Sequence, residues 1–113
     1  MPNTMQRLTS EQDVDTLFAE ERAILYKHST RCPISSAAYD QVETFLARYP
    51  DAPVYVVDVI AHRSTSRYAA EKSGVRHHSP QVIFLREGAA VWDTSHDGVT
   101  VREMARRWDE LRA

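Results

Sequence analysis

Apolar and polar residues follow one another along the chain in patterns that predict eight secondary-structure elements. Four segments repeat apolar residues at helical spacing, and four shorter segments are rich in Val, Ile, Leu and aromatic residues, as strands are. The predicted helices cover about residues 10–21, 33–50, 64–73 and 99–111. The predicted strands cover residues 23–28, 53–60, 82–85 and 89–92.

Local signals support several of these boundaries. Thr9 and Gln12 have the spacing of a capping box at the start of the first helix. Pro33 suits the first position of the second helix, where its missing N–H costs nothing. Gly74 is placed to end the third helix, and Gly88 lies in the short turn of a predicted antiparallel hairpin.

The order of the elements predicts an α/β fold. The strand of residues 53–60 is nearly continuous in apolar residues, which is typical of a strand buried on both faces of a parallel pair. The first two strands and the helix between them form a right-handed βαβ unit, and the hairpin adds two antiparallel strands. We therefore expect one domain, residues 1–113, with a four-stranded mixed sheet and helices on both faces. Ligands usually bind at the carboxyl ends of strands in such folds.

Composition and charge argue against some classes of partner. The chain has 14 Lys plus Arg against 16 Asp plus Glu, a net charge of -2, so no basic excess points to nucleic acid or an anionic membrane. The N-terminus lacks the apolar core of a signal peptide, and no segment approaches the roughly 20 apolar residues of a transmembrane helix. We expect a cytoplasmic protein that binds neither nucleic acid nor a membrane.

The single cysteine directly precedes the second predicted helix. Because Cys32 has no partner for an intramolecular disulfide, it is a buried apolar residue, a metal ligand or a reactive thiol. A helix N-terminus stabilises a thiolate through its unpaired N–H groups and its dipole. The residues around Cys32 are polar: Ser29, Thr30, Arg31, Ser35 and Ser36. A core cysteine usually has apolar neighbours, so we interpret Cys32 as a reactive thiol.

Three segments together resemble a known family. "KHSTRCPIS", "GVRHHSPQV" and "AVWDTSH" are similar in order and spacing to segments of the monothiol bacilliredoxins, small bacterial proteins of the bacillithiol system with a thioredoxin-like fold. A Cys-Pro pair alone is a weak signal, but the three segments span nearly the whole chain. One departure is Arg31, at a position where the family motif has threonine.

The resemblance implies an enzyme, a thiol–disulfide oxidoreductase that removes bacillithiol from S-bacillithiolated client proteins. Cys32 would attack the bacillithiol sulfur, and an external thiol would complete the cycle, since Ser35 stands where dithiol thioredoxins carry the resolving cysteine. No bound cofactor is implied, and bacillithiol is the thiol co-substrate. The resemblance also implies a cis Ser79–Pro80 bond beside the sulfur, with the Ser79 backbone available to align a substrate chain.

Bacillithiol, as the resemblance implies, carries a sugar and malate carboxylates, so we expect a local cationic patch despite the net charge of -2. The candidates for this patch are Arg31, Arg76, His77 and His78. The predicted substrate-binding residues are Arg31, Pro33, Ser35, His77, His78, Ser79 and Pro80. For each charged residue the alternative is an ordinary solvated surface charge, and for each histidine it is a ring satisfied by the backbone.

Two other function classes remain open. The first is a carrier of an iron–sulfur cluster or a metal ion. Monothiol glutaredoxins that carry an iron–sulfur cluster use a Cys-Gly-Phe-Ser motif, whereas Pro33 and Ile34 are bulkier beside the sulfur in this chain. A mononuclear zinc site could be formed by His28, Cys32, His77 and His78. That spacing matches no standard zinc pattern, so we predict no metal site. The second class is a thioredoxin-fold interaction module whose cysteine performs no turnover.

Overall fold

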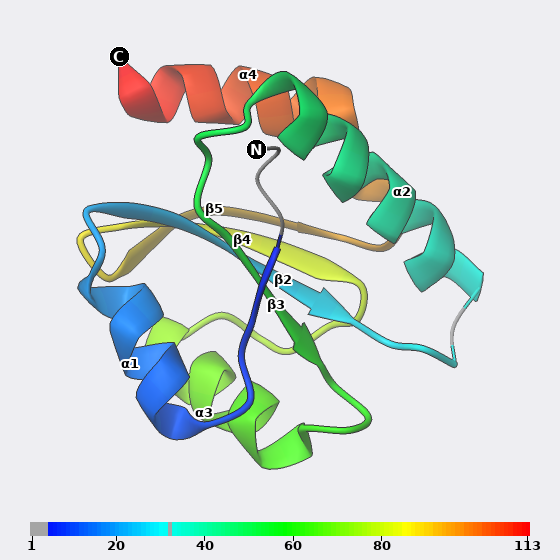
Figure 1. Ribbon diagram of the computed structural model, residues 1–113, viewed down its shortest axis with the longest axis vertical. Helices are drawn as coiled ribbons and strands as arrows, with labels where there is room; N and C mark the ends of the chain where they lie inside the picture. Colours follow the sequence, from blue (N-terminus) through cyan, green and yellow to red (C-terminus); the bar gives the residue numbers. More distant parts are fainter. Residues whose placement is uncertain (1–4, 32) are drawn as a thin grey trace.

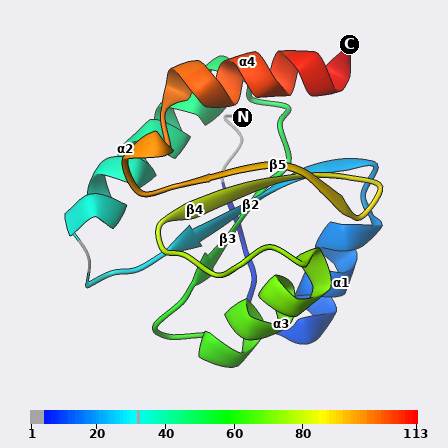
Figure 2. The same ribbon diagram turned by 180° about the vertical axis from the view of Figure 1, so that it is seen from behind.

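The computed structural model describes residues 5–31 and 33–113, in which a sheet separates two pairs of helices. The elements in chain order are β1 (Gln6–Arg7), α1 (Glu11–Ala19), β2 (Arg22–His28), α2 (Pro33–Arg48), β3 (Val54–Asp58), α3 (Arg63–Ser73), β4 (Gln81–Arg86), β5 (Ala89–Ser95), the short 3-10 helix η1 (His96–Gly98) and α4 (Val101–Arg112). Figure 1 shows α2 and α4 above the sheet and α1 and α3 below it, and Figure 2 shows the same layers from behind.

The strand order of the mixed sheet is β1-β3-β2-β4-β5. β2 runs parallel to β3, while β4 is antiparallel to both β2 and β5, so the predicted βαβ unit and hairpin are confirmed. The prediction of four strands was wrong by one, because Gln6 and Arg7 add β1 at the β3 edge. Both residues are exposed and polar, so no apolar pattern marks the strand, and it is the next residue, Leu8, that enters the core.

The first helix starts one residue later than the capping prediction placed it. Ser10, and not Thr9, is the N-cap, and its hydroxyl accepts a hydrogen bond from the Asp13 N–H at 3.2 Å. The Asp13 carboxylate in turn accepts one from the Thr9 N–H at 2.9 Å. Asp13, and not Gln12, therefore accepts a hydrogen bond from the backbone at the start of α1, and that bond comes from Thr9, the residue before the N-cap. The predicted cap of α3 is confirmed, since Gly74 has a left-handed φ of 72°.

Alternation along β2 divides its side chains between two cores. Ile24 and Tyr26 belong to the core beneath α2 and α4, whereas Ala23 and Leu25 belong to the core beneath α1 and α3. Successive side chains of a strand point to opposite faces of the sheet. Lys27 therefore lies on the α3 side, directly after Tyr26 on the α2 side.

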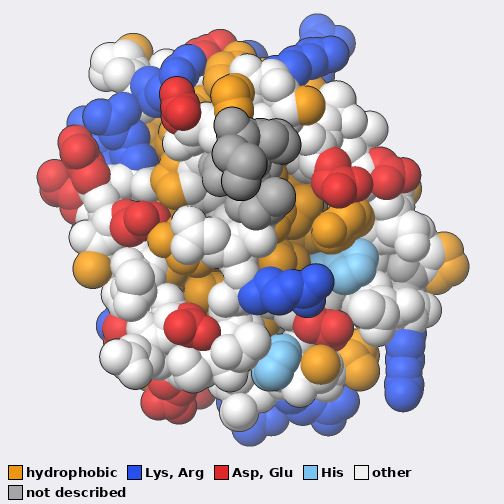
Figure 3. Space-filling view, viewed as in Figure 1, with side chains coloured by type: hydrophobic (Ala, Val, Ile, Leu, Met, Phe, Trp, Pro, Cys, Tyr) orange, Lys and Arg blue, Asp and Glu red, His pale blue; other side chains and the backbone are white. Residues whose placement is uncertain are grey.

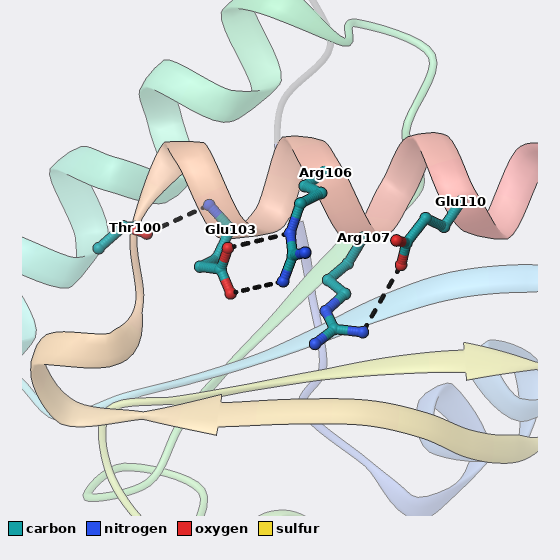
Figure 4. Close-up of polar contacts among 5 residues, drawn as sticks. All are labelled: Thr100, Glu103, Arg106, Arg107 and Glu110. Atoms are coloured by element: carbon teal, nitrogen blue, oxygen red, sulfur yellow. Dashed lines mark hydrogen bonds and ion pairs between the residues drawn. The ribbon is translucent and has the colours of Figure 1, made fainter.

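The last helix closes the α2 side of the sheet (Figure 4). The Thr100 hydroxyl caps α4 by accepting a hydrogen bond from the Glu103 N–H at 3.3 Å. Met104 and Trp108 are buried on the inner face, while Arg107 lies over the Trp92 ring at 5.4 Å. In the part of the chain that the structure describes, no helix has the length and apolar character needed to cross a bilayer.

Candidate active site

Three loops meet at the end of the sheet where β2 and β3 finish (Figure 1). They are residues 29–31 after β2, residues 59–62 after β3, and residues 74–80 before β4. The Val59 N–H donates to the His28 carbonyl at 2.9 Å and so ties the second loop to the end of β2. Cys32, the predicted catalytic residue, lies outside the described residues; its chain neighbours are Arg31 and Pro33, the first residue of α2.

On the α2 side, Tyr26 connects β2 to the start of α2. Its hydroxyl donates to the Ser35 carbonyl at 3.2 Å and lies 2.9 Å from His28 Nδ1. A phenol has one proton, so the bond to Ser35 requires His28 to donate from Nδ1, which leaves Nε2 as the acceptor of the ring. Burial raises the pKa of Tyr26 far above its usual value, and burial lowers the pKa of His28. Both side chains are therefore uncharged at neutral pH.

Ser35 anchors the loop after β2 from the first turn of α2. Its side chain is 0% exposed, and its hydroxyl accepts a hydrogen bond from the Ser29 N–H at 3.3 Å. The Ser29 hydroxyl accepts one from the Arg31 N–H at 3.4 Å. The structure thus assigns Ser35 a positioning role, and contact between Ser35 and a substrate stays a prediction.

On the α3 side, Lys27 lies beneath the loop before Pro80. The Lys27 side chain is 0% exposed, and its Nζ lies 3.3 Å from His77 Nδ1. Burial lowers the pKa of Lys27 to about 8, so the amine is mostly charged at pH 7 and donates to the imidazole. The pKa of His77 is also lowered, first by burial and then by the charge of Lys27, which keeps the ring neutral.

Gln81 holds the same loop from the start of β4. It faces Lys27 in the β2–β4 register and is fully buried. Its Nε2 donates to the Arg76 carbonyl at 2.8 Å, and its Oε1 accepts a hydrogen bond from the His78 N–H at 3.5 Å. Two buried polar side chains on adjacent strands therefore fix the course of this loop.

The Ser79–Pro80 peptide bond is cis, as the family resemblance implied. Pro80 is buried, and its carbonyl accepts a hydrogen bond from the His96 N–H at 2.9 Å. The Ser79 hydroxyl is buried and has no hydrogen-bond partner within the described ranges. The β5–η1 junction therefore borders the loop before β4, which places His96 at the site.

The predicted cationic residues do not gather into one cluster. His77 lies against Lys27, whereas His78 packs edge-on against His96 with ring centroids 5.6 Å apart. Arg31 and Arg76 are exposed, and neither side chain forms an ion pair or hydrogen bond with another described residue. Pro33 and Ile34 are also exposed, in the first turn of α2.

A cavity of about 410 Å³ opens beside His77, between α3 and the loops at this end of the sheet. It is lined by Val59, Ile60, Arg63, Ser66, Arg67, Ala70 and His77. Of these residues only His77 was predicted from the sequence to belong to the site. The available signal was the spacing of Arg63 and Arg67, which puts two arginines on one face of a helix near the predicted site.

Asp58 shapes the loop between β3 and this cavity. Its carboxylate accepts hydrogen bonds from the Ala61 N–H at 3.0 Å and the Ile60 N–H at 2.9 Å. These bonds, the Ala61 bond first, lower the pKa of Asp58. The carboxylate is therefore engaged by the backbone. Over residues 5–31 and 33–113, no three His, Cys, Asp or Glu side chains are arranged to hold a metal ion.

Comparisons with known proteins agree with this architecture. The family model described as monothiol bacilliredoxin BrxC matches residues 6–104. A solved structure assigned as an oxidoreductase with a thioredoxin fold is 33% identical, with a TM-score of 0.84, and the match covers 90% of this chain and 91% of that chain.

Two thioredoxins are similar at lower identity. The thioredoxin of Malassezia sympodialis is 14% identical, with a TM-score of 0.78 over 100% of this chain and 96% of that chain. The thioredoxin of Trypanosoma brucei brucei is 12% identical, with a TM-score of 0.80 over 98% of this chain and 93% of that chain. At such identity these two similarities establish the fold alone.

Proposed function

Because the chain belongs to the monothiol bacilliredoxin family, we propose that it removes bacillithiol from S-bacillithiolated proteins through Cys32. The family and the thioredoxin fold support a thiol redox function. The observation that carries the proposal is that the sole cysteine is followed in the sequence by Pro33, the first residue of α2, and that α2 begins at the end of the sheet where the Ser79–Pro80 loop also lies. Bacillithiol serves as co-substrate, and no bound cofactor takes part.

The proposed reaction is a pair of thiol–disulfide exchanges. The Cys32 thiolate attacks the bacillithiol sulfur of the modified client, the mixed disulfide breaks, and the client thiolate leaves and takes up a proton. Cys32 is then joined to bacillithiol by a new disulfide. Because the chain has no second cysteine, an external thiolate attacks this disulfide. If that thiolate is bacillithiol, the products are bacillithiol disulfide and the regenerated Cys32 thiolate.

The start of α2 supplies the proposed activation of the thiol. The first amides of a helix have no intrahelical acceptor, and the helix dipole places partial positive charge there. Pro33 has no N–H, so the amides of Ile34 and Ser35 are the first helical donors after Cys32 in the sequence. The Tyr26 and Ser29 bonds to Ser35 support this role, because they hold the first turn in place.

The loop before β4 is the proposed docking element for the client. In this proposal the Ser79 backbone aligns the client chain, while Pro33, His78 and Pro80 border it. Support comes from the anchoring of the loop by Gln81 and Lys27, since a fixed backbone loses little conformational freedom when a chain binds to it.

The test measures the masses of the client and of the protein after a single turnover. A client protein carrying one bacillithiol is incubated with wild type or with Cys32→Ser, and both proteins are analysed intact. We expect the client to lose the bacillithiol mass and wild type to gain it, whereas Cys32→Ser leaves the client modified. A wild-type protein that gains no mass while the client stays modified would contradict the proposal.

A matched client carrying glutathione tests the thiol specificity. If bacillithiol is recognised, the bacillithiolated client reacts faster than the glutathionylated one at equal concentration. Equal rates would mean that the protein is a general monothiol reductase, and the proposed co-substrate would be wrong.

A further inference from the structure

The cavity between α3 and the loop before β4 has the composition of a site for a small anion. Its lining includes Arg63, Arg67 and no carboxylate. Neither arginine forms an ion pair with any residue that the structure describes, whereas Arg22, Arg106, Arg107 and Arg112 all pair with acidic side chains. Figure 3 shows basic side chains along the lower edge of the molecule, where α3 lies in Figure 1. Two guanidinium groups are therefore free to bind a ligand.

A buried hydroxyl in the same lining lacks a partner. Ser66 is 3% exposed, and its Oγ forms no hydrogen bond within the described part of the chain. A buried polar group without a partner costs free energy, so such groups in folded proteins usually meet a ligand or a water molecule. Ser66 lies between Arg63 and Arg67 on α3, which gives the cavity three donors from one helix.

His77 adds a fourth donor to the lining, from the loop before β4. Its Nδ1 faces the Lys27 ammonium, so the neutral ring carries its proton on Nε2. The remaining lining is apolar and comes from Val59, Ile60 and Ala70. A volume of about 410 Å³ is within the range of small-molecule sites. The cavity thus combines an apolar wall with donors suited to carboxylates.

We propose that this cavity binds the malate end of bacillithiol, with Arg63 and Arg67 holding the carboxylates and Ser66 donating to one of them. The inference rests on the proposed function, because it assigns a place to the carboxylates of that co-substrate. Arginine suits this task because its planar fork donates two parallel hydrogen bonds to a carboxylate. The cavity is next to the proposed docking loop, since His77 belongs to both.

The test uses the malyl glucosaminide fragment of bacillithiol, which has no thiol, so binding is measured without any reaction. Calorimetric titration compares wild type with Arg63→Gln/Arg67→Gln and with Ser66→Ala. We expect about a tenfold or greater loss of affinity for the double variant and a smaller loss for Ser66→Ala. The dimethyl ester of the fragment should bind wild type as weakly as the fragment binds the double variant.

The matched control is Arg48→Gln/Arg86→Gln, which removes the same charge at the other end of the molecule. Arg86 lies opposite Arg22, the first residue of β2, and Arg48 is the last residue of α2. This control should change the affinity less than twofold. Equal affinity of wild type and Arg63→Gln/Arg67→Gln, or no binding to wild type at millimolar fragment, overturns the inference.

The two proposals fail in different ways. If wild type reduces the bacillithiolated client but fragment binding does not depend on the two arginines, the cavity assignment is wrong and the proposed function stands. If fragment binding depends on the arginines while the client stays modified, the cavity is a carboxylate site and the proposed function is wrong.

Discussion

Lys27 Nζ lies 3.3 Å from His77 Nδ1, although the two residues are 50 positions apart in the chain. The contact joins the end of β2 to the loop before β4, beneath the site and away from solvent. A fully buried lysine is rare, because removing an ammonium from water is costly. The imidazole is the one hydrogen-bond partner of the ammonium in the described part of the chain, and burial explains why the pKa of Lys27 falls to about 8.

The lowered pKa of Lys27 predicts that stability rises with pH. Between about pH 8 and the usual lysine value of 10.5, the unfolded chain binds the proton and the folded chain does not. Raising the pH through this window therefore favours the folded state, by about 3 kcal/mol in total. Lys27→Met should remove this rise and increase the free energy of unfolding at pH 7. Urea unfolding of both proteins at pH 7, 8, 9 and 10 measures the difference.

The control for this experiment is Lys72→Met, which changes a surface lysine. Lys72 lies 3.1 Å from Asp15, and the hydrogen bond to Asp15 raises the pKa of this amine. Its removal should therefore leave the rise between pH 8 and 10 in place. The same pH dependence in wild type and Lys27→Met would show that Lys27 is not the titrating group.

Gln81 is predicted to determine the order of the loop before β4. Gln81→Met keeps the side-chain length but leaves the Arg76 carbonyl and the His78 N–H without their partner. We expect a loss of about 2 kcal/mol in the free energy of unfolding and faster amide exchange in residues 75–79. Gln12→Met, a change at an exposed position of α1, should alter neither quantity. Unchanged exchange in Gln81→Met would refute the anchoring role.

The Tyr26 hydroxyl is predicted to stabilise the start of α2. Tyr26→Phe leaves the Ser35 carbonyl and His28 Nδ1 without a hydrogen-bond partner in a buried setting. We expect the free energy of unfolding to fall by about 1–2 kcal/mol and the rate of client reduction to fall with it. Tyr39→Phe is the matched control, because Tyr39 packs against the same rings and its hydroxyl has no partner among the described residues. Equal stability of the two variants would contradict this prediction.

The thiol of Cys32 is predicted to have a pKa below the free value of about 8.5, because it directly precedes a helix. Iodoacetamide alkylation rates measured from pH 4 to 10 report the thiolate fraction. Free cysteine under the same conditions is the reference. An inflection at or above the free value would remove the proposed activation by α2.

The regular spacing of apolar residues made the fold predictable from the sequence. The site was less predictable, because it is formed by residues that are far apart in the chain. The βαβ unit, the hairpin and the Gly74 cap follow from local patterns, and all three are confirmed. β1 is too short and too polar for any pattern to reveal. The burial of Lys27 was also beyond the sequence, because a lysine at a strand end is normally solvent-exposed.

The residues that line the cavity were also hard to predict from the sequence. In the sequence Arg63 and Arg67 look like ordinary surface residues of an amphipathic helix, and only the fold brings them into the same cavity lining as His77. The resemblance to the family pointed correctly to the cis Ser79–Pro80 bond, which no local signal could have established. The positions of His96 and Gln81 at the site likewise depend on which strands become neighbours.

The alternation of Tyr26 and Lys27 on β2 links correct folding to a correctly assembled site. A slip of one residue in the pairing of β2 with β4 would exchange the two faces of the strand. The ammonium would then enter the apolar core under α2, and the phenol would lie beneath the loop before β4. Chains with the wrong register would therefore be unstable as well as inactive. Tyr26 and Lys27, which shape the site, thus also specify the register of the central strand.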